Sequence, residues 1–223
     1  MAVISYASTK GGVGKTTAAA IAVSILSDAG VSLCVIDADP NQSLRRWAES
    51  SDLGQNVQIH GILNEDELLD QIEAAASENQ FVLVDLEGSM NVALSDAIAA
   101  SNLVIIPVQA SQLDAEEAVK VLKLVEKQKR LTKRNIDVAL LWQKSPPAIV
   151  TRTEKHIREQ FLAGNVTSLN TRIVDREAFK AMFTFSSTLG NLTPDQVSDP
   201  IKAKLNAIDY VNELIEHVKG LEV

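Results

Sequence analysis

Six short runs of apolar residues divide the chain into strand-length segments. Most are nearly continuous rather than alternating, which is typical of strands buried on both faces of a parallel sheet. Stretches with helical periodicity separate most of these runs. The runs cover residues 2–8, 31–37, 57–60, 81–85, 103–108 and 136–142. This alternation predicts an α/β fold of the doubly wound class, with a mainly parallel sheet and helices on both faces.

The length and composition of the chain predict one domain over residues 1–223. The chain has 223 residues, 46% of them hydrophobic, which is enough for one core and too few for a second domain of ordinary size. We find neither a segment as long as a membrane span nor the layout of a signal peptide, so we expect a cytoplasmic protein. Cys34 lies inside an apolar run and is expected to be a buried structural thiol.

A glycine-rich segment joins the first predicted strand to an alanine-rich helical segment that begins at Thr17. Strand, glycine loop and helix in this order are the context of a phosphate-binding loop, in which backbone N–H groups face phosphate oxygens. Lys15 is expected to reach the β- and γ-phosphates of a nucleotide, and the Thr16 hydroxyl to bind Mg²⁺. The nucleotide-binding residues predicted here are Gly11, Gly12, Val13, Gly14, Lys15, Thr16 and Thr17.

Carboxylates stand where two of the predicted strands end. Asp37 and Asp39 close the run at 31–37, and Asp85 closes the run at 81–85. Ligands of open α/β sheets bind at the carboxyl ends of strands, so we expect all three beside the glycine loop as cofactor-binding residues, with Asp37 near the metal and Asp85 reaching Mg²⁺ through water. A compatible alternative is that Asp39 caps a helix that has Pro40 in its first position.

The loop departs from the usual pattern, because Thr9 stands where a glycine is expected five residues before Gly14. With its early lysine, the sequence KGGVGKTT resembles the deviant phosphate loop of the ParA/MinD family of ATPases. The stretches DADPNQSLRRW, VLVDLEGS and SNLVIIPVQASQLD extend the resemblance over residues 2–114. They are similar to the short ParA-type partition ATPases of plasmids and to the related factor that assists T-DNA transfer in plant-infecting bacteria.

This resemblance implies a P-loop NTPase fold of the deviant Walker A class, with ATP and Mg²⁺ as cofactors. It implies that Lys10 crosses the interface of an ATP-bound homodimer and neutralises charge during phosphoryl transfer. It also implies that Asp39 orients the attacking water, and that Thr16, Asp39 and Asp85 hold the metal, partly through water. The dimer would bind non-specific DNA on the nucleoid, and a ParB-type centromere-binding protein would stimulate hydrolysis and release it. Since the chain begins at its first strand, we expect no N-terminal helix-turn-helix domain.

Glu87 and Gly88, which follow Asp85 closely in the sequence, raise separate expectations. Gly88 is expected to let a backbone N–H approach the γ-phosphate. Glu87 departs from the family pattern of small or proline residues, and its carboxylate would repel a triphosphate unless it turned outward, so its effect on hydrolysis is open. Farther along the chain, Gln143, Arg172 and Arg176 follow strand-like segments, and one of them is a candidate contact for adenine or for the partner's nucleotide.

The charge of the chain is distributed unevenly. The formal net charge is −8, yet residues 120–158 contain eleven basic residues against three acidic ones. Five of these basic residues follow helical steps of three and four, and like charges at that spacing destabilise a helix slightly. Such a row of basic residues therefore favours a polyanionic partner, and we expect this partner to be non-specific DNA. The alternative is that the row is an ordinary solvated face of the helix. The row consists of Lys120, Lys123, Lys127, Arg130 and Arg134.

Alternative functions remain open at this point. One is assistance to conjugative DNA transfer, and another is positioning of cell-division machinery by a C-terminal amphipathic helix on a membrane. The chain does end in a predicted helix, which starts at Asp199-Pro200 and stops at Gly220. Acidic residues cancel its lysines, so we expect it to pack on the sheet rather than bind a membrane. The apolar stripe expected to pack consists of Ile201, Leu205, Ile208, Ile215 and Val218.

Overall fold

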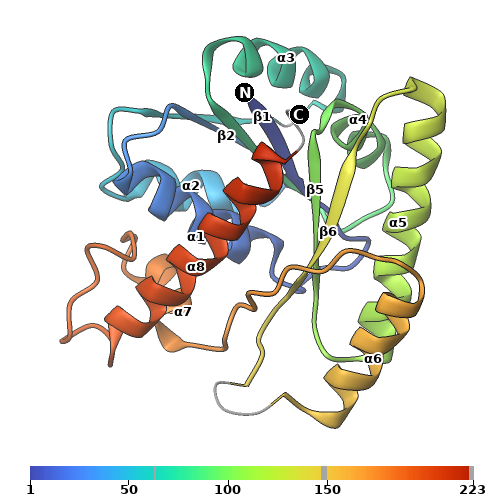
Figure 1. Cartoon of the computed structure of the whole chain (residues 1–223). Coiled ribbons are helices and arrows are strands. Elements are labelled where there is room, and N and C mark those ends of the chain that lie inside the picture. The colour runs from blue at the N-terminus through green and yellow to red at the C-terminus, as the bar shows by residue number, and fades with distance from the viewer. Residues whose placement is uncertain (63, 147–149, 221–223) are drawn as a thin grey trace.

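The computed structural model describes residues 1–62, 64–146 and 150–220, and within them six parallel strands form one sheet (Figure 1). The spatial order is β3-β2-β4-β1-β5-β6, and neighbouring strands all run parallel. All six predicted runs form strands, with ends that differ from the prediction by no more than two residues. The strands are β1 (Ala2–Tyr6), β2 (Leu33–Ala38), β3 (Val57–Gly61), β4 (Phe81–Leu86), β5 (Leu103–Val108) and β6 (Asp137–Trp142).

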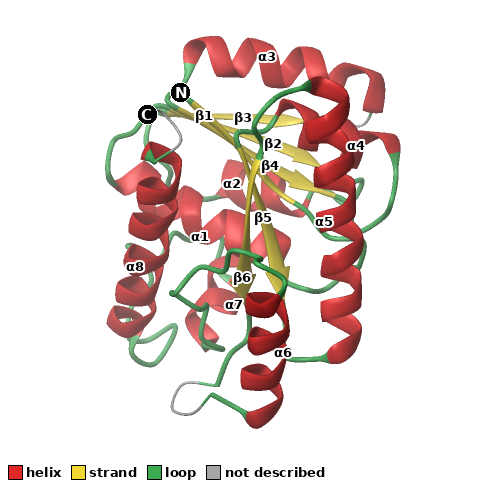
Figure 2. Cartoon of the chain, turned by 45° about the vertical axis from the view of Figure 1, so that its right-hand side comes forward, coloured by secondary structure: helices red, strands yellow, loops and turns green. Residues whose placement is uncertain are grey.

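Helices cover both faces of this sheet, which confirms the doubly wound α/β class (Figure 2). One face carries α1 (Lys15–Asp28), α2 (Ser43–Ser50), α7 (Glu177–Thr184) and α8 (Pro200–Lys219). The other face carries α3 (Leu68–Glu78), α4 (Val92–Ala100), α5 (Gln112–Thr132) and α6 (Arg152–Ala163), and a short 3₁₀ turn (Glu65–Glu67) precedes α3. Among the described residues, no helix combines the length and apolarity needed to cross a membrane.

The two helical layers explain why the strands read as continuous apolar runs. Successive side chains of a strand point to opposite faces, so a strand covered on both sides buries every residue. In β1, Val3 packs with the α3–α6 layer, and Ile4 and Tyr6 pack with the α1 layer. Cys34 of β2 is fully buried, as expected, and its burial raises its pKa to about 12.

The prediction for the packed face of α8 was only partly right. Of the five apolar residues expected to pack, Val218 is buried and Ile215 is partly buried against the same core, whereas Ile201 and Leu205 are 70% and 56% exposed. The helix packs against α1 through a stripe that includes two alanines, and small side chains allow close approach of two helices. Tyr210 also lies on the buried face, and its hydroxyl is 2.9 Å from that of Tyr6. The buried stripe is Ala203, Ala207, Tyr210, Val211, Leu214 and Val218.

Candidate active site

The glycine loop lies between β1 and α1 at the carboxyl edge of the sheet. Gly12 and Gly14 have φ values of +74° and +112°, which glycine adopts at little cost. Gly14 is the residue that precedes α1, and within the described part of the chain no side chain caps the first N–H groups of this helix. The first turn contains no acidic residue either. These N–H groups are therefore available to an anion, which the positive end of the helix dipole also attracts.

Lys15 is the first residue of α1 and is only 6% exposed. Its Nζ lies 3.5 Å from the carbonyl oxygen of Lys10, so the side chain curls back over the loop. Burial lowers the pKa of Lys15, whereas nearby carboxylates, led by that of Asp85, act against this shift. An ammonium group held under a glycine loop in this way is suited to bind phosphate oxygens.

Asp85 lies in the floor of the site, in register with Tyr6 of β1 and Asp37 of β2. It is fully buried, and among the described residues neither of its carboxylate oxygens has a hydrogen-bond partner. Burial raises the pKa of Asp85 to about 7, the nearby Thr16 hydroxyl opposes the rise, and Asp37 adds to it. An orphaned buried carboxylate is costly, and a bound cation or its water ligands would relieve that cost.

Asp37 differs from Asp85, because both of its carboxylate oxygens accept hydrogen bonds from backbone N–H groups. One oxygen accepts from the N–H of Asp39 at 3.0 Å, and the other accepts from the N–H of Arg45 at 2.9 Å. Asp37 therefore stabilises the turn from β2 into α2. Burial raises the pKa of Asp37, and these backbone hydrogen bonds oppose the rise.

Asp39 follows β2, is half-buried, and accepts from the N–H of Asn41 at 2.8 Å. The alternative of a helix that starts at Pro40 was wrong, because α2 begins at Ser43 after Gln42. Asp37, rather than Asp39, hydrogen-bonds the first turn of that helix. Among the described residues, the second carboxylate oxygen of Asp39 accepts no hydrogen bond, so this carboxylate keeps capacity for a water molecule.

Gly88 packs against the glycine loop. A Cβ at this position would lie 2.7 Å from the carbonyl carbon of Lys10 and from the nitrogen of Gly11, closer than real contacts allow. Glu87 accepts from the Ser89 hydroxyl at 2.8 Å and from the Asn91 amide at 3.3 Å. Its carboxylate is therefore bound to its own loop, but its charge still acts on Lys15, where it opposes the lowering of the lysine pKa.

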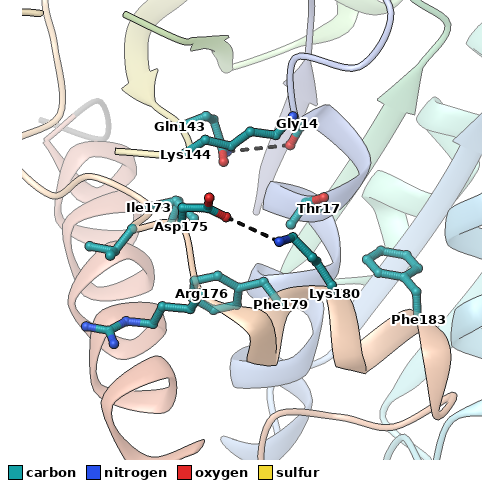
Figure 3. A pocket seen from close by; sticks show the side chains of 11 residues that line it. Gly14, Thr17, Gln143, Lys144, Ile173, Asp175, Arg176, Phe179, Lys180 and Phe183 are labelled. Carbon is teal, nitrogen blue, oxygen red and sulfur yellow. Dashed lines mark hydrogen bonds and ion pairs between the residues drawn. The ribbon is translucent and has the colours of Figure 1, made fainter. Parts of the chain in front are cut away.

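A cavity of about 300 Å³ opens beside the loop, between α1, the residues after β6, and α7 (Figure 3). Gln143 and Lys144 lie at its upper side, where the Lys144 Nζ is 3.1 Å from the carbonyl oxygen of Gly12. Asp175 and Lys180 face each other across it, with 3.7 Å between carboxylate and ammonium. The lining residues are Gly14, Thr17, Gln143, Lys144, Ile173, Val174, Asp175, Arg176, Phe179, Lys180 and Phe183.

This cavity was only partly foreseen. Gln143 and Arg176 were candidates for contact with a base, and both line the cavity, whereas Arg172 is absent from its lining. The wall formed by residues 173–183 was missed. No apolar run or glycine motif marks that segment, and its place beside the loop depends on how α7 packs.

A divalent cation at this site would rely on few protein ligands. Within the described part of the chain, no group of three or more His, Cys, Asp or Glu side chains could hold a metal. Thr16, Asp39 and Asp85 nevertheless lie around the loop, and the unpartnered oxygens of Asp85 fit a water-mediated contact. Mg²⁺ typically keeps several waters and binds through one or two carboxylates plus substrate phosphates, so this donor set suits a metal–nucleotide complex.

The basic row lies on the exposed face of α5. Lys120, Lys123, Lys127 and Arg130 are exposed on this helix, opposite the buried Ala118, Val121 and Val125. Lys120 is 2.7 Å from Glu117, whereas Lys123 and Lys127 have no ion pair among the described residues.

Arg134 does not belong to the row. The helix ends at Thr132, Lys133 has a φ of +56°, and the chain turns away there. Arg134 instead donates to the carbonyl oxygen of Ala99 on the neighbouring α4 at 3.0 Å. The predicted row is thus shortened to four residues, because a left-handed residue interrupts the helical spacing.

Proteins of known identity resemble this chain along most of its length. The family described as VirC1 protein matches residues 1–214. Protein ParA of Rhizobium radiobacter is 30% identical over 196 residues, which cover 88% of each chain. The virC1 protein of the same organism is 29% identical over 192 residues, covering 82% of this chain and 80% of the relative.

Solved structures share the fold at lower identity. MinD of Aquifex aeolicus has a TM-score of 0.75 at 17% identity, with 97% of each chain covered. A plasmid partition protein of Borrelia burgdorferi, bound to AMPPNP, has a TM-score of 0.70 at 20% identity and covers 95% of this chain and 99% of its own. The match over nearly the whole sequence leads to one conclusion: the chain belongs to the VirC1 protein family, is similar to protein ParA of Rhizobium radiobacter, and shares its fold with MinD.

Proposed function

We propose that this protein is an ATP-driven DNA-partitioning switch, which dimerises and binds non-specific DNA with ATP and is reset by hydrolysis. The observation that carries the proposal is the pairing of an open helix N-terminus and Lys15 with the buried, unpartnered Asp85. Lys15 and the first N–H groups of α1 lie where an anion would bind, and the Asp85 carboxylate lies where a metal bound to that anion would be held. This arrangement suits a nucleoside triphosphate complexed with Mg²⁺ better than an uncomplexed anion.

In the proposed reaction, the residues of this chain act mainly by positioning. Lys15 and the loop N–H groups bind the β- and γ-phosphates, and the Thr16 hydroxyl and Asp85 bind Mg²⁺, Asp85 through water. The metal supplies charge neutralisation for phosphoryl transfer. Asp39 orients the attacking water, and Lys10 acts from the other subunit. Gly88 keeps the backbone that follows β4 against the loop.

The cavity beside the loop is proposed to hold the adenine base. Its volume lies at the lower end of the range of about 300 to 1,000 Å³ for small-molecule sites. Phe179 and Ile173 give it an apolar floor, and Gln143 and Asp175 add hydrogen-bonding groups. The cavity adjoins Gly14 and Thr17, so a base there would be joined to phosphates at the loop.

The biological task that we propose is segregation of plasmid or chromosome copies with a ParB-type partner. A curated relative named ParA supports partition, and a relative named virC1 supports the alternative of assistance to DNA transfer. A MinD-like role at a membrane is the remaining alternative, and the exposure of Ile201 and Leu205 on α8 favours it. Against it, Lys202 and Lys204 beside them are paired with Asp199 and Asp28, which leaves little positive charge for anionic lipid.

The test is binding to non-specific duplex DNA with ADP, with ATP and with a slowly hydrolysed ATP analogue, across a salt series. We expect binding only with the triphosphates, and a steep loss of affinity as salt rises. Sedimentation with anionic liposomes in the same nucleotide states tests the membrane alternative. Liposome binding without DNA binding would overturn the DNA switch in favour of positioning at a membrane.

The proposed action of Lys10 across subunits has its own test. Lys10→Ala is expected to bind nucleotide as a monomer but to lose dimerisation and turnover, because the charge supplied to the partner's phosphates is absent. Sedimentation velocity with the ATP analogue and steady-state ATPase assays measure both properties. Full ATPase activity in this variant would refute the cross-subunit assignment.

A further inference from the structure

Lys10 has a partner within its own chain. Its Nζ lies 2.5 Å from Oδ1 of Asp114, in the first turn of α5. The Lys10 side chain is 46% exposed, whereas that of Asp114 is only 3% exposed. The lysine therefore reaches from the loop surface onto a carboxylate that is almost withdrawn from solvent.

Asp114 depends on this contact. Lys10 is the one side-chain partner that its carboxylate has among the described residues. Removing one member of such a pair leaves an uncompensated buried charge, which is strongly unfavourable. Lys10 loses much less on separation, because its exposed ammonium can be hydrated.

A second contact joins the same two segments. The Thr9 hydroxyl donates a short hydrogen bond to Glu117, one helical turn after Asp114 on α5. Two consecutive loop residues are thus bound to one face of α5. Glu117 also pairs with Lys120, the first member of the basic row, so the loop and that row are joined through adjacent side chains.

We propose that Asp114 is a positioning residue, which holds Lys10 on its own subunit until the nucleotide of a partner subunit draws the lysine away. This inference rests on the proposed function, in which Lys10 acts across the dimer. The Lys10 ammonium cannot form full ion pairs with Asp114 and with a partner's phosphates at the same time. When the dimer closes, the buried Asp114 carboxylate must therefore lose its cation. The cost of that exchange raises the nucleotide concentration at which the dimer forms.

The test compares Asp114→Asn with wild type and with Glu116→Gln. The asparagine keeps the size of the side chain and removes the buried charge. Glu116 is an exposed carboxylate on the same helix, bonded to Gln112 at 3.4 Å, so its variant has the same charge change without the loop contact. Sedimentation velocity across a titration with a slowly hydrolysed ATP analogue, and with ADP as reference, gives the midpoint of dimerisation.

We expect Asp114→Asn to lower this midpoint by about threefold to tenfold, and Glu116→Gln to leave it at the wild-type value. An unchanged or raised midpoint in Asp114→Asn, or an equal shift in the control, overturns the inference. If wild type forms no dimer with the analogue, the proposed function fails instead.

A second measurement tests the contact itself without nucleotide. Urea denaturation of Lys10→Met, Asp114→Asn and the double variant forms a double-mutant cycle. Lys10→Met is expected to be the least stable, and Asp114→Asn is expected to restore most of the loss in the double variant. Additive effects would show that no interaction holds Lys10 in the monomer, and would overturn the inference even where dimerisation occurs.

Discussion

The carboxyl edge of the sheet and the outer face of α5 both gather charged residues, but they differ in burial. Lys15, Asp37 and Asp85 are buried, whereas Lys123 and Lys127 are exposed. Burying a charge costs several kcal/mol unless it is compensated, while adjacent exposed lysines cost only a few tenths. The buried charges are therefore strong evidence for a ligand, and the exposed row is weaker evidence that needs a binding measurement. The predictions below test this difference, from the largest expected effect to the smallest.

The largest effect is expected from Lys15→Ala. Removing this ammonium leaves phosphate charge without its partner in a buried site, so kcat/KM for ATP should fall by at least about 100-fold. The matched control is Lys155→Ala, an exposed lysine on α6 away from the loop. Steady-state ATPase assays compare the two variants. Similar losses of kcat/KM in Lys15→Ala and Lys155→Ala would show that a buried lysine at the loop matters no more for ATP hydrolysis than an exposed one.

Asp85→Asn is expected to stabilise the nucleotide-free protein while it abolishes turnover. The folded-state pKa is about 7, well above the roughly 3.9 of an unfolded aspartate, so the folded protein holds an extra proton between those values. The contribution of Asp85 to the free energy of unfolding is fully present below about pH 4, and it falls by a few kcal/mol as pH rises through 7. The variant lacks this loss.

Urea denaturation at pH 5 and pH 8 measures the difference. Wild type should lose more stability than Asp85→Asn between these two pH values, and the variant should be the more stable protein at pH 8. A variant less stable than wild type at pH 8 would contradict the view that the cost of burying the Asp85 charge outweighs its attraction to Thr16 and Lys15.

A smaller loss is expected from Gly88→Ala. The added methyl group would meet the backbone of Lys10 and Gly11 at 2.7 Å, so the loop must shift and nucleotide affinity should fall by roughly tenfold. Gly164→Ala is the control, because its Cβ would lie 3.4 Å from the Phe161 carbonyl oxygen, an ordinary van der Waals contact. Fluorescent-nucleotide titration measures both, and equal affinities would show that the loop tolerates the displacement.

The smallest effect concerns the exposed row. Neutralising Lys123 and Lys127 together to glutamine should reduce the slope of log K against log salt for non-specific DNA by about two, with ATPase activity in the absence of DNA unchanged. The matched control neutralises Lys202 and Lys219 of α8, which are also exposed. Identical slopes in wild type and both variants would assign the row to an ordinary solvated surface.

Much of the active site could be predicted because its chemistry depends on short local patterns. The glycines of the loop need no distant partner to be recognised, since their spacing follows from the backbone turn. Asp85 could be placed because a continuous apolar strand that ends in a carboxylate delivers it to the sheet edge. The hydrogen bonds that Asp37 accepts from the N–H groups of Asp39 and Arg45 could not be predicted, since they depend on how the chain turns after β2.

The prediction for α8 shows the limit of periodicity. Its sequence contains two apolar stripes, one rich in isoleucine and leucine and one rich in alanine. Hydrophobicity alone favoured the first, whereas close packing on the alanine-rich α1 selects the second, together with the hydrogen bond of Tyr210 to Tyr6. The cavity wall at 173–183 and the shortened basic row were hidden for a related reason, because both depend on where distant segments lie.

The sequence by itself determined the alternating strands and helices, the phosphate loop and the buried thiol, since each follows from local spacing and hydrophobicity. Only the tertiary structure decided which partner each charge finds. It buried Asp85 beside Thr16 and Lys15, engaged Asp37 with backbone N–H groups, and placed Asp114, 104 residues away along the chain, against Lys10. The physical reason is that solvation and ion pairing depend on distances across the fold, which no local pattern contains.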